Sequence, residues 1–361
     1  MNEEIKLMKG NEAIAHAAIR CGCDGYFGYP ITPQSEIMET LMEEQPWKTT
    51  GMVVLQAESE VAAVNMVYGG AGCGKRVMTS SSSPGMSLKM EGVSYIAGAE
   101  LPCLLVNVMR GGPGLGTIQP SQADYFQAVK GGGHGDYKVI TLAPASVQEM
   151  ADFTKLGFEL AFKYRNPAMI LADGLIGQMM EKVILPPFTP RFTAEEISKI
   201  SPWATYGKPA SREPNVITSL ELESKDMEAR NLKFQAKYRE IEEKEVLYEE
   251  MNCDDAEYIL VAFGSSARVC QKAVETAREQ GIKAGLIRPK TLWPFPTRLI
   301  ESYANSAKVK GFMSVEMNAG QMVEDVQLAV NGKKKVAFFG RLGGIVPTPD
   351  EVVDAIKEKL F

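Results

Sequence analysis

Short, continuous apolar runs alternate with helical segments along most of this 361-residue chain. The run from Leu101 to Met109 carries no polar side chain except Asn107, which is typical of a central parallel strand covered on both faces. Residues 10–22 instead have apolar side chains at helical spacing and end in glycine. Because strands that alternate with helices form parallel sheets, this pattern predicts an α/β fold.

The alternation is interrupted once along the chain. Residues 1–185 and 257–361 both show it, whereas 186–256 starts with a proline-rich stretch and continues into densely charged sequence. We therefore predict two α/β domains joined by a linker that contains a long, charged helix. The chain length supports two domains, because a single hydrophobic core rarely grows beyond about 250–300 residues.

Charge and cysteine content exclude several classes of protein. The 39 lysines and arginines against 45 aspartates and glutamates give a net charge of −6, which argues against non-specific binding of nucleic acid. No apolar run approaches the ~20 residues of a membrane span, and the charged N-terminus predicts a cytoplasmic protein. The six cysteines show neither a disulfide framework nor the spacing of zinc or iron–sulfur ligands, so no metal site is expected on this chain.

Four polar or glycine-rich segments follow predicted strands of the first domain. They are 28–33 (GYPITP), 56–60 (QAESE), 79–85 (TSSSSPG) and 109–114 (MRGGPG). Ligands of open parallel sheets bind at the carboxyl ends of strands, so these segments hold the candidate site.

Arg110 and Thr32 are candidate anion ligands in these segments. A guanidinium at the end of the most apolar strand can clamp a carboxylate with two parallel hydrogen bonds, although a surface ion pair would also explain Arg110. The glycines after it do not form GxGxxG, so a dinucleotide fingerprint is not met. Thr32 precedes Pro33 and is expected to cap the following helix or to help hold an anion.

Glu58 and Glu60 follow a strand and begin a helix. Acidic residues in a first turn complement the helix dipole, which is sufficient reason for both. Their apolar flanks also predict a buried carboxyl with a raised pKa, which suits a group that shares a proton with a ring nitrogen. The polar run 79–83 is either a plain turn or a ligand wall, and His134 is either catalytic or merely exposed.

Together the four segments resemble the thiamine-diphosphate-dependent 2-oxoacid:ferredoxin oxidoreductases, in particular the alpha-type subunit that carries the pyrimidine-binding domain. The segments 79–85 and 131–137 look most like the enzyme for 2-oxoisovalerate (3-methyl-2-oxobutanoate). The resemblance covers nearly the whole chain. It implies a pyrimidine domain of the thiamine-diphosphate-binding fold in 1–185 and a transketolase C-terminal-like domain in 257–361.

The resemblance also implies roles for individual residues. Glu58 matches the glutamate that faces N1′ of the aminopyrimidine, with Glu60 as its close neighbour. Thr32 and Arg110 match residues near the substrate carboxylate. The other expected cofactor contacts lie in two of the loops: Tyr29, Pro30, Ser82 and Ser83. Many relatives have glycine where this chain has Ser83, so the resemblance does not determine the shape of the pocket at this position.

One half of a thiamine site is missing from the sequence. The diphosphate–Mg²⁺ motif is usually Gly-Asp-Gly with an Asn at a fixed spacing further along the chain. Here Ala172-Asp173-Gly174 is not followed by an Asn at the usual spacing. The resemblance therefore implies a beta-type partner subunit that holds the diphosphate and Mg²⁺. It further implies a gamma-type subunit, a ferredoxin-like iron–sulfur subunit, ferredoxin as electron acceptor and coenzyme A as acyl acceptor.

The expected activity is the coenzyme A-dependent oxidative decarboxylation of a 2-oxoacid, most closely 2-oxoisovalerate. The absence of a second cation beside Arg110 in these segments disfavours a dicarboxylate, but 2-oxoglutarate and pyruvate stay open. Two other hypotheses are a non-catalytic scaffold subunit and a free-standing nucleotide- or phosphate-binding enzyme. The missing phosphate motifs argue against the second of these.

Overall fold

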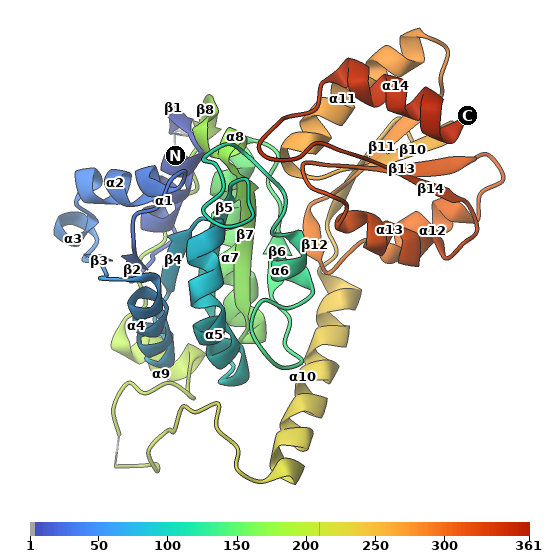
Figure 1. The fold of residues 1–361 in the computed structure, drawn as a ribbon. Helices are drawn as coiled ribbons and strands as arrows, with labels where there is room; N and C mark the ends of the chain where they lie inside the picture. Colours follow the sequence, from blue (N-terminus) through green and yellow to red (C-terminus); the bar gives the residue numbers. More distant parts are fainter. Residues whose placement is uncertain (1–3, 209) are drawn as a thin grey trace.

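The first domain is built on a seven-stranded sheet. The computed structural model describes residues 4–208 and 210–361 (Figure 1). The strand order is β12-β6-β7-β5-β4-β2-β3, and every pairing is parallel except that of β12 with β6. The strands are β2 (Gly25–Gly28), β3 (Val53–Gln56), β4 (Val77–Ser81), β5 (Cys103–Met109), β6 (Ile140–Leu142), β7 (Pro167–Asp173) and β12 (Thr291–Trp293). The apolar run identified in the sequence is β5, which is buried along its whole length in the middle of this sheet.

The second domain contains a five-stranded sheet in the order β14-β13-β10-β11-β9. Its strands are β9 (Tyr248–Met251), β10 (Tyr258–Val261), β11 (Ala284–Pro289), β13 (Gly311–Glu316) and β14 (Lys335–Gly340). Only β9 runs antiparallel to its neighbour. A separate antiparallel pair joins β1 (Ile5–Lys9) to β8 (Met180–Ile184). The predicted α/β fold with parallel sheets is confirmed.

Helices cover both sheets (Figure 1). On the first sheet, α4 and α5 pack against each other on one face, and α1, α2 and α7 pack together on the other. On the second sheet, α11 packs with α14 and α12 with α13. The helices of the first domain are α1 (Gly10–Arg20), α2 (Ser35–Glu44), α3 (Pro46–Thr49), α4 (Glu60–Gly72), α5 (Ser83–Gly98), α6 (Tyr125–Val129), α7 (Val147–Tyr164) and α8 (Gly174–Gln178). Those of the second are α11 (Gly264–Glu279), α12 (Thr297–Ala304), α13 (Met322–Val330) and α14 (Pro349–Leu360).

The linker contains the long charged helix that the sequence predicts. This helix is α10 (Ser224–Lys244), and a short helix α9 (Ala194–Ile200) precedes it. One side of α10 is buried through Phe234, Tyr238 and Ile241, whose spacing of four and three residues puts them on one face. None of the described helices is long and apolar enough to cross a membrane.

Strand pairing crosses the sequence-based division in two places. β9 lies in the predicted linker but pairs with β11, and β12 lies in the predicted second domain but pairs with β6 of the first. The boundaries at residues 185 and 256 stay a prediction.

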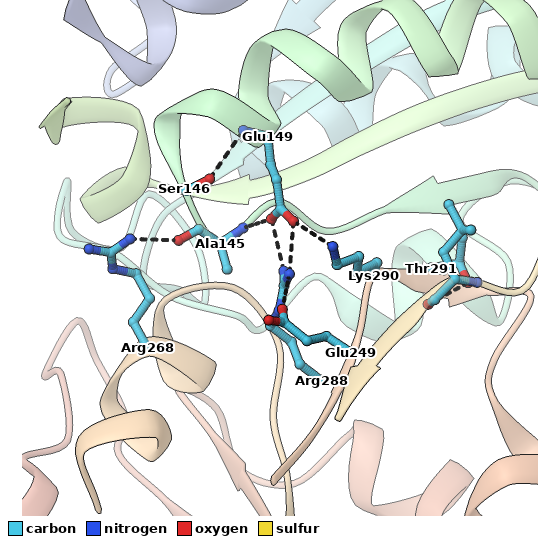
Figure 2. A network of polar contacts seen from close by, with 9 residues as sticks. Ala145, Ser146, Glu149, Glu249, Arg268, Arg288, Lys290 and Thr291 are labelled. Atoms are coloured by element: carbon cyan, nitrogen blue, oxygen red, sulfur yellow. Dashed lines mark hydrogen bonds and ion pairs between the residues drawn. The ribbon is translucent and has the colours of Figure 1, made fainter. Parts of the chain in front are cut away.

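A polar network joins the two domains (Figure 2). Arg288 is almost completely buried and donates two hydrogen bonds of 2.8 Å to Glu149 at the start of α7, and it also bonds to Glu249 of β9. Lys290 lies 3.1 Å from the same Glu149 carboxylate. Burial alone would raise the pKa of Glu149, but the hydrogen bonds and charge of Arg288 outweigh it and hold that pKa below its usual range. The network fixes the second domain against the first.

Candidate active site

The four polar segments meet at one edge of the seven-stranded sheet. They follow β2, β3, β4 and β5, which are neighbours in the order β5-β4-β2-β3 and run in the same direction. Their carboxyl ends therefore lie side by side, as predicted from the sequence. The predicted residues on this edge are Tyr29, Pro30 and Thr32 after β2, Glu58 after β3, Ser82 and Ser83 after β4, and Arg110 after β5.

Arg110 connects two of these loops. Its Nη1 donates to the carbonyl oxygen of Thr32 at 3.0 Å, and its Nη2 donates to the carbonyl of Leu115 at 2.9 Å. Its Nε is buried and has no hydrogen-bond partner within the described ranges. Two backbone carbonyls thus fix the plane of the guanidinium, and no carboxylate of the described chain pairs with it. The alternative that Arg110 serves a surface ion pair does not describe this arrangement.

Thr32 does not cap a helix, contrary to the sequence-based expectation. Helix α2 begins three residues later, at Ser35, and no side chain caps it. Residues 31–34 form a turn closed by a 3.0 Å bond from the Gln34 N–H to the Ile31 carbonyl. The side chain of Thr32 is left exposed beside Arg110.

Ser83 is turned toward the interior of the Arg110 loop. Its Oγ lies 2.6 Å from Asp124 Oδ2 and accepts the Arg110 N–H at 3.1 Å. Asn107 donates to the same Asp124 oxygen at 2.9 Å. Burial raises the pKa of Asp124, although the hydrogen bonds from Ser83 and Asn107 oppose that rise. The extra side chain at Ser83 therefore holds the Arg110 loop in place.

Glu58 is exposed in this chain, so the prediction of a buried carboxyl at this position is wrong. β3 is the edge strand of the sheet, and its Val53 and Leu55 are also exposed. An apolar composition alone does not distinguish a central strand from an edge strand that another surface covers. The carboxylate of Glu58 accepts a 2.7 Å bond from Ser59, whose hydroxyl also caps α4.

Glu60 is the buried acid of the pair, with 7% of its surface exposed. It packs against the first turn of α5, where a Cβ at Gly85 would lie 2.7 Å from Glu60 Oε1 and 2.3 Å from Ser81 Oγ. A larger residue at position 85 would therefore force these two buried side chains to move. The buried hydroxyls of Ser81 and Ser82 have no hydrogen-bond partner in the described parts of the chain.

An apolar surface adjoins these residues. The outer sides of α4 and α5 expose Val61, Met66, Leu88 and Tyr95, next to the exposed edge strand β3. An amphipathic surface helix would present polar side chains there. Exposed apolar patches of this kind commonly mark contacts with another protein.

Two other residues noted in the sequence lie away from this edge. His134 Nδ1 contacts Ser94 Oγ at 3.3 Å, and Ser94 is about 16 Å along α5 from Ser83 by helix rise. Asp173 is fully buried, caps α8 and accepts from Ser265 of the second domain at 2.6 Å. The carboxylate of Asp173 therefore joins the two domains.

Two cavities in the described parts of the chain lie away from this edge. A hollow of about 890 Å³ lies between α10 and the β12–α12 segment, and none of the predicted site residues lines it. The candidate site is an open surface. Sequence reasoning missed Gln34, Lys89 and Asp124, which bond to the segments of this edge, because such polar side chains on helices and loops are usually exposed.

Comparisons with known proteins agree with this geometry. The family model for pyruvate flavodoxin/ferredoxin oxidoreductase, thiamine diphosphate-binding, matches residues 16–249, and the model for pyruvate:ferredoxin oxidoreductase core domain II matches 256–352. The chain belongs to the 2-oxoacid:ferredoxin oxidoreductase family. The predicted family is thus confirmed.

Relatives within the family align over almost the full chain. The ketoisovalerate oxidoreductase subunit VorB of Methanothermobacter marburgensis is 51% identical over 355 residues, covering 98% of this chain and 97% of the relative. The 2-oxoglutarate synthase subunit KorA of Methanocaldococcus jannaschii is 35% identical over 371 residues, covering 98% of this chain and 99% of the relative. As in those oxidoreductases, this chain is one subunit of an enzyme.

Solved structures show the same architecture. The 2-oxoglutarate:ferredoxin oxidoreductase from Magnetococcus marinus, with 2-oxoglutarate, coenzyme A and succinyl-CoA bound, has a TM-score of 0.86 at 27% identity. It covers 99% of this chain, which spans 66% of the length of that chain. A split-gene transketolase has a TM-score of 0.61 at 13% identity and covers 98% of this chain, which shows a shared fold.

Proposed function

We propose that this chain is the alpha-type subunit of a 2-oxoacid:ferredoxin oxidoreductase that acts on 2-oxoisovalerate (3-methyl-2-oxobutanoate) with coenzyme A. The observation that carries the proposal is the exposed Glu58 carboxylate, at the same sheet edge as Arg110 and beside an uncovered apolar surface. The 51% identity to the ketoisovalerate oxidoreductase subunit supports this substrate. The relatives named for 2-oxoglutarate are less similar, at 29–36% identity, and that acid is the alternative.

The residues fit the aminopyrimidine half of thiamine diphosphate. Glu58 offers a free carboxylate to a ring nitrogen, and the unpartnered buried hydroxyls of Ser81 and Ser82 offer further polar contacts. Tyr29 and Pro30 form the adjoining half-buried loop. When bound, thiamine diphosphate supplies the electron sink for the loss of carbon dioxide from a 2-oxoacid.

Arg110 and Thr32 bind the carboxylate of the substrate in this proposal. The Thr32 and Leu115 carbonyls hold the guanidinium in one plane, which is the condition for two parallel hydrogen bonds to a carboxylate. The exposed Thr32 hydroxyl is available as a further donor. One guanidinium suits a monocarboxylate such as 2-oxoisovalerate.

The apolar surface of α4, α5 and β3 is where a beta-type subunit completes the site. That subunit supplies the ligands of the diphosphate and Mg²⁺. Iron–sulfur clusters are assigned to a ferredoxin-like subunit because five of the six cysteines of this chain are buried, and burial raises the pKa of both Cys21 and Cys103 to about 12. A gamma-type subunit and ferredoxin complete the proposed assembly.

Co-expression with the partner subunits tests the function directly. The purified complex is assayed for coenzyme A-dependent reduction of ferredoxin with 2-oxoisovalerate, pyruvate and 2-oxoglutarate. We expect the highest kcat/KM with 2-oxoisovalerate and negligible activity of the isolated chain. Robust activity of the isolated chain would refute the shared site. A higher kcat/KM with 2-oxoglutarate than with 2-oxoisovalerate would make 2-oxoglutarate the substrate instead.

A further inference from the structure

Lys89 lies in the interior directly beneath the candidate site. It is on α5, and none of its surface is exposed. Its neighbour Leu88 is 56% exposed, so the charged and apolar residues occupy the reverse of their usual positions on a helix. A fully buried lysine is costly, and it is kept only where hydrogen bonds satisfy its donors.

The Lys89 ammonium bonds to the end of β4. Nζ donates to Thr79 Oγ1 at 2.6 Å and to the Ser80 carbonyl at 3.1 Å. Both acceptors lie immediately before the loop that contains Ser82 and Ser83. Lys89 therefore ties the second turn of α5 to β4, the strand that leads into this loop.

The same contacts continue to the loop after β2. The Ser80 hydroxyl donates to Gln34 Oε1 and lies 2.7 Å from the Tyr26 hydroxyl. Gln34 is fully buried, and its Nε2 donates to the Tyr29 carbonyl at 3.1 Å. The contacts thus lead from Lys89 to the backbone carbonyl of Ser80, and from the Ser80 hydroxyl through the Gln34 side chain to the Tyr29–Thr32 loop.

A charge faces Lys89 from the neighbouring helix. Burial lowers the pKa of the Lys89 amine to about 7, and the negative charge of Glu60 on α4 opposes that shift. Glu60 itself packs against Gly85 at the start of α5. α4, α5, β4 and the loop after β2 are in this way joined beneath one surface.

We propose that Lys89 is a positioning residue of the active site, which fixes the spacing between the Tyr29–Thr32 loop and the Ser82–Ser83 loop through Ser80 and Gln34. The proposal rests on the proposed function, because it assigns the two loops to thiamine diphosphate and the 2-oxoacid. Buried polar networks whose members are all satisfied specify one arrangement of the backbone, which an apolar side chain of similar length would not. Lys89 acts on the ligands only through these loops.

The test compares three variants of the assembled complex. Lys89→Met removes the ammonium and keeps the length of the side chain. Ser80→Ala keeps Lys89 and breaks the link to Gln34. Lys237→Met is the matched control: burial lowers the pKa of Lys237 to about 8, and its Nζ bonds to Glu100 and the Arg165 carbonyl, outside the site.

The readouts are the dissociation constant of thiamine diphosphate with Mg²⁺, measured by calorimetry on the apo-complex, and the KM and kcat for 2-oxoisovalerate. We expect Lys89→Met to weaken thiamine diphosphate binding about 10-fold, and Ser80→Ala to weaken it severalfold, from loss of the network. Lys237→Met should stay within about twofold in both readouts whatever its effect on thermal stability. If Lys89→Met does not assemble, Ser80→Ala decides the question alone.

The outcomes separate the two proposals. The positioning role is refuted if the wild-type complex binds thiamine diphosphate and oxidises the acid, and Lys89→Met has the same dissociation constant, KM and kcat within twofold. If Lys89→Met does not assemble, the same comparison is made with Ser80→Ala. The positioning role is also refuted if Lys237→Met weakens cofactor binding as much as Lys89→Met. If the wild-type complex neither binds thiamine diphosphate nor oxidises any 2-oxoacid, the proposed function itself fails.

Discussion

Both parallel sheets of this protein carry a glutamate at the carboxyl end of a strand, and the two glutamates have opposite surroundings. Glu316 ends β13 in the second domain and is completely buried. Its carboxylate accepts hydrogen bonds from Ser314, Asn318 and three backbone N–H groups at the start of α13. Glu58 follows β3 in the first domain, is exposed, and accepts one bond from Ser59.

The difference shows what makes a strand end available for chemistry. In the second domain the chain supplies its own anion to the positive end of α13, and no bonding capacity of Glu316 is left for a ligand. In the first domain the carboxylate of Glu58 accepts one bond, from Ser59, keeps acceptor capacity for a ligand and adjoins an uncovered apolar surface. Topology places a candidate site at the carboxyl ends of the strands in both sheets. The hydrogen bonds already accepted by Glu316 and Glu58 indicate that only the edge with Glu58 is available to a ligand.

Glu58→Gln should give the largest effect on activity and sharpens this comparison most. In the proposed function Glu58 exchanges a proton with the cofactor ring, and loss of such a group should lower kcat by about 10²- to 10⁴-fold. Because Glu58 is exposed, the free energy of unfolding should change little. Ferredoxin reduction by the reconstituted complex measures the first effect, and urea unfolding of the chain the second.

The matched control for that variant is Glu43→Gln, at another exposed glutamate, on α2. It should leave both readouts unchanged. Full activity of Glu58→Gln would instead support the scaffold hypothesis, in which this domain only holds the assembly together.

Glu316→Gln should show the reverse pattern. The amide would present N–H groups to the N–H donors of α13, so buried donors would lose their acceptor, at a cost of about 3 kcal/mol in the free energy of unfolding. Glu324→Gln, an exposed position in the first turn of the same helix, is the control. If Glu316→Gln lowered kcat without lowering stability, the contrast between the two sheet edges would be wrong.

Local patterns were enough to predict the α/β fold and to place the four candidate segments at one edge of the first sheet. Apolar periodicity and strand–helix alternation are properties of neighbouring residues, so Cys103–Met109 could be identified as a central strand directly. Which strand lies at an edge depends on the order of strands, which the sequence does not state. Glu58 was therefore expected to be buried when it is exposed.

Tertiary contacts also overrode a local rule at Thr32. A threonine before proline is a good helix start, but the neighbouring Gln34 is recruited by Ser80 and Tyr29 and the helix begins after it. Lys89 could not be found for the same reason. A lysine in a helical pattern is ordinarily exposed, and only its packing against β4 reveals that it is buried.

Arg110→Lys tests whether the site edge of the first sheet binds the carboxylate of the substrate. Lysine keeps the charge but lacks the planar fork that Thr32 and Leu115 now orient, so kcat/KM for 2-oxoisovalerate should fall about 10- to 100-fold, mainly through KM. Arg268→Lys, which alters a bond to the Ala145 carbonyl in the network between the domains, serves as the control and should change KM by less than twofold. An unchanged KM in Arg110→Lys would remove Arg110 from the substrate site.

Ser83→Ala should have the smallest effect on KM, and it tests whether Ser83 holds the Arg110 loop in place at the site edge of the first sheet. Loss of the bonds to Asp124 and the Arg110 N–H should cost about 1 kcal/mol in the free energy of unfolding and raise KM severalfold. Ser87→Ala, one turn further along α5, is the control and should leave KM unchanged.

The pKa of Asp124 is already raised by burial, and without the Ser83 bond it should rise further. Because the native state then binds more protons than the unfolded state, stability should fall as pH rises from about 4 to the raised pKa, and this fall should extend to higher pH in Ser83→Ala. Urea unfolding of the chain between pH 4 and pH 8 measures the difference; identical profiles for the two proteins would show that Ser83 does not support Asp124.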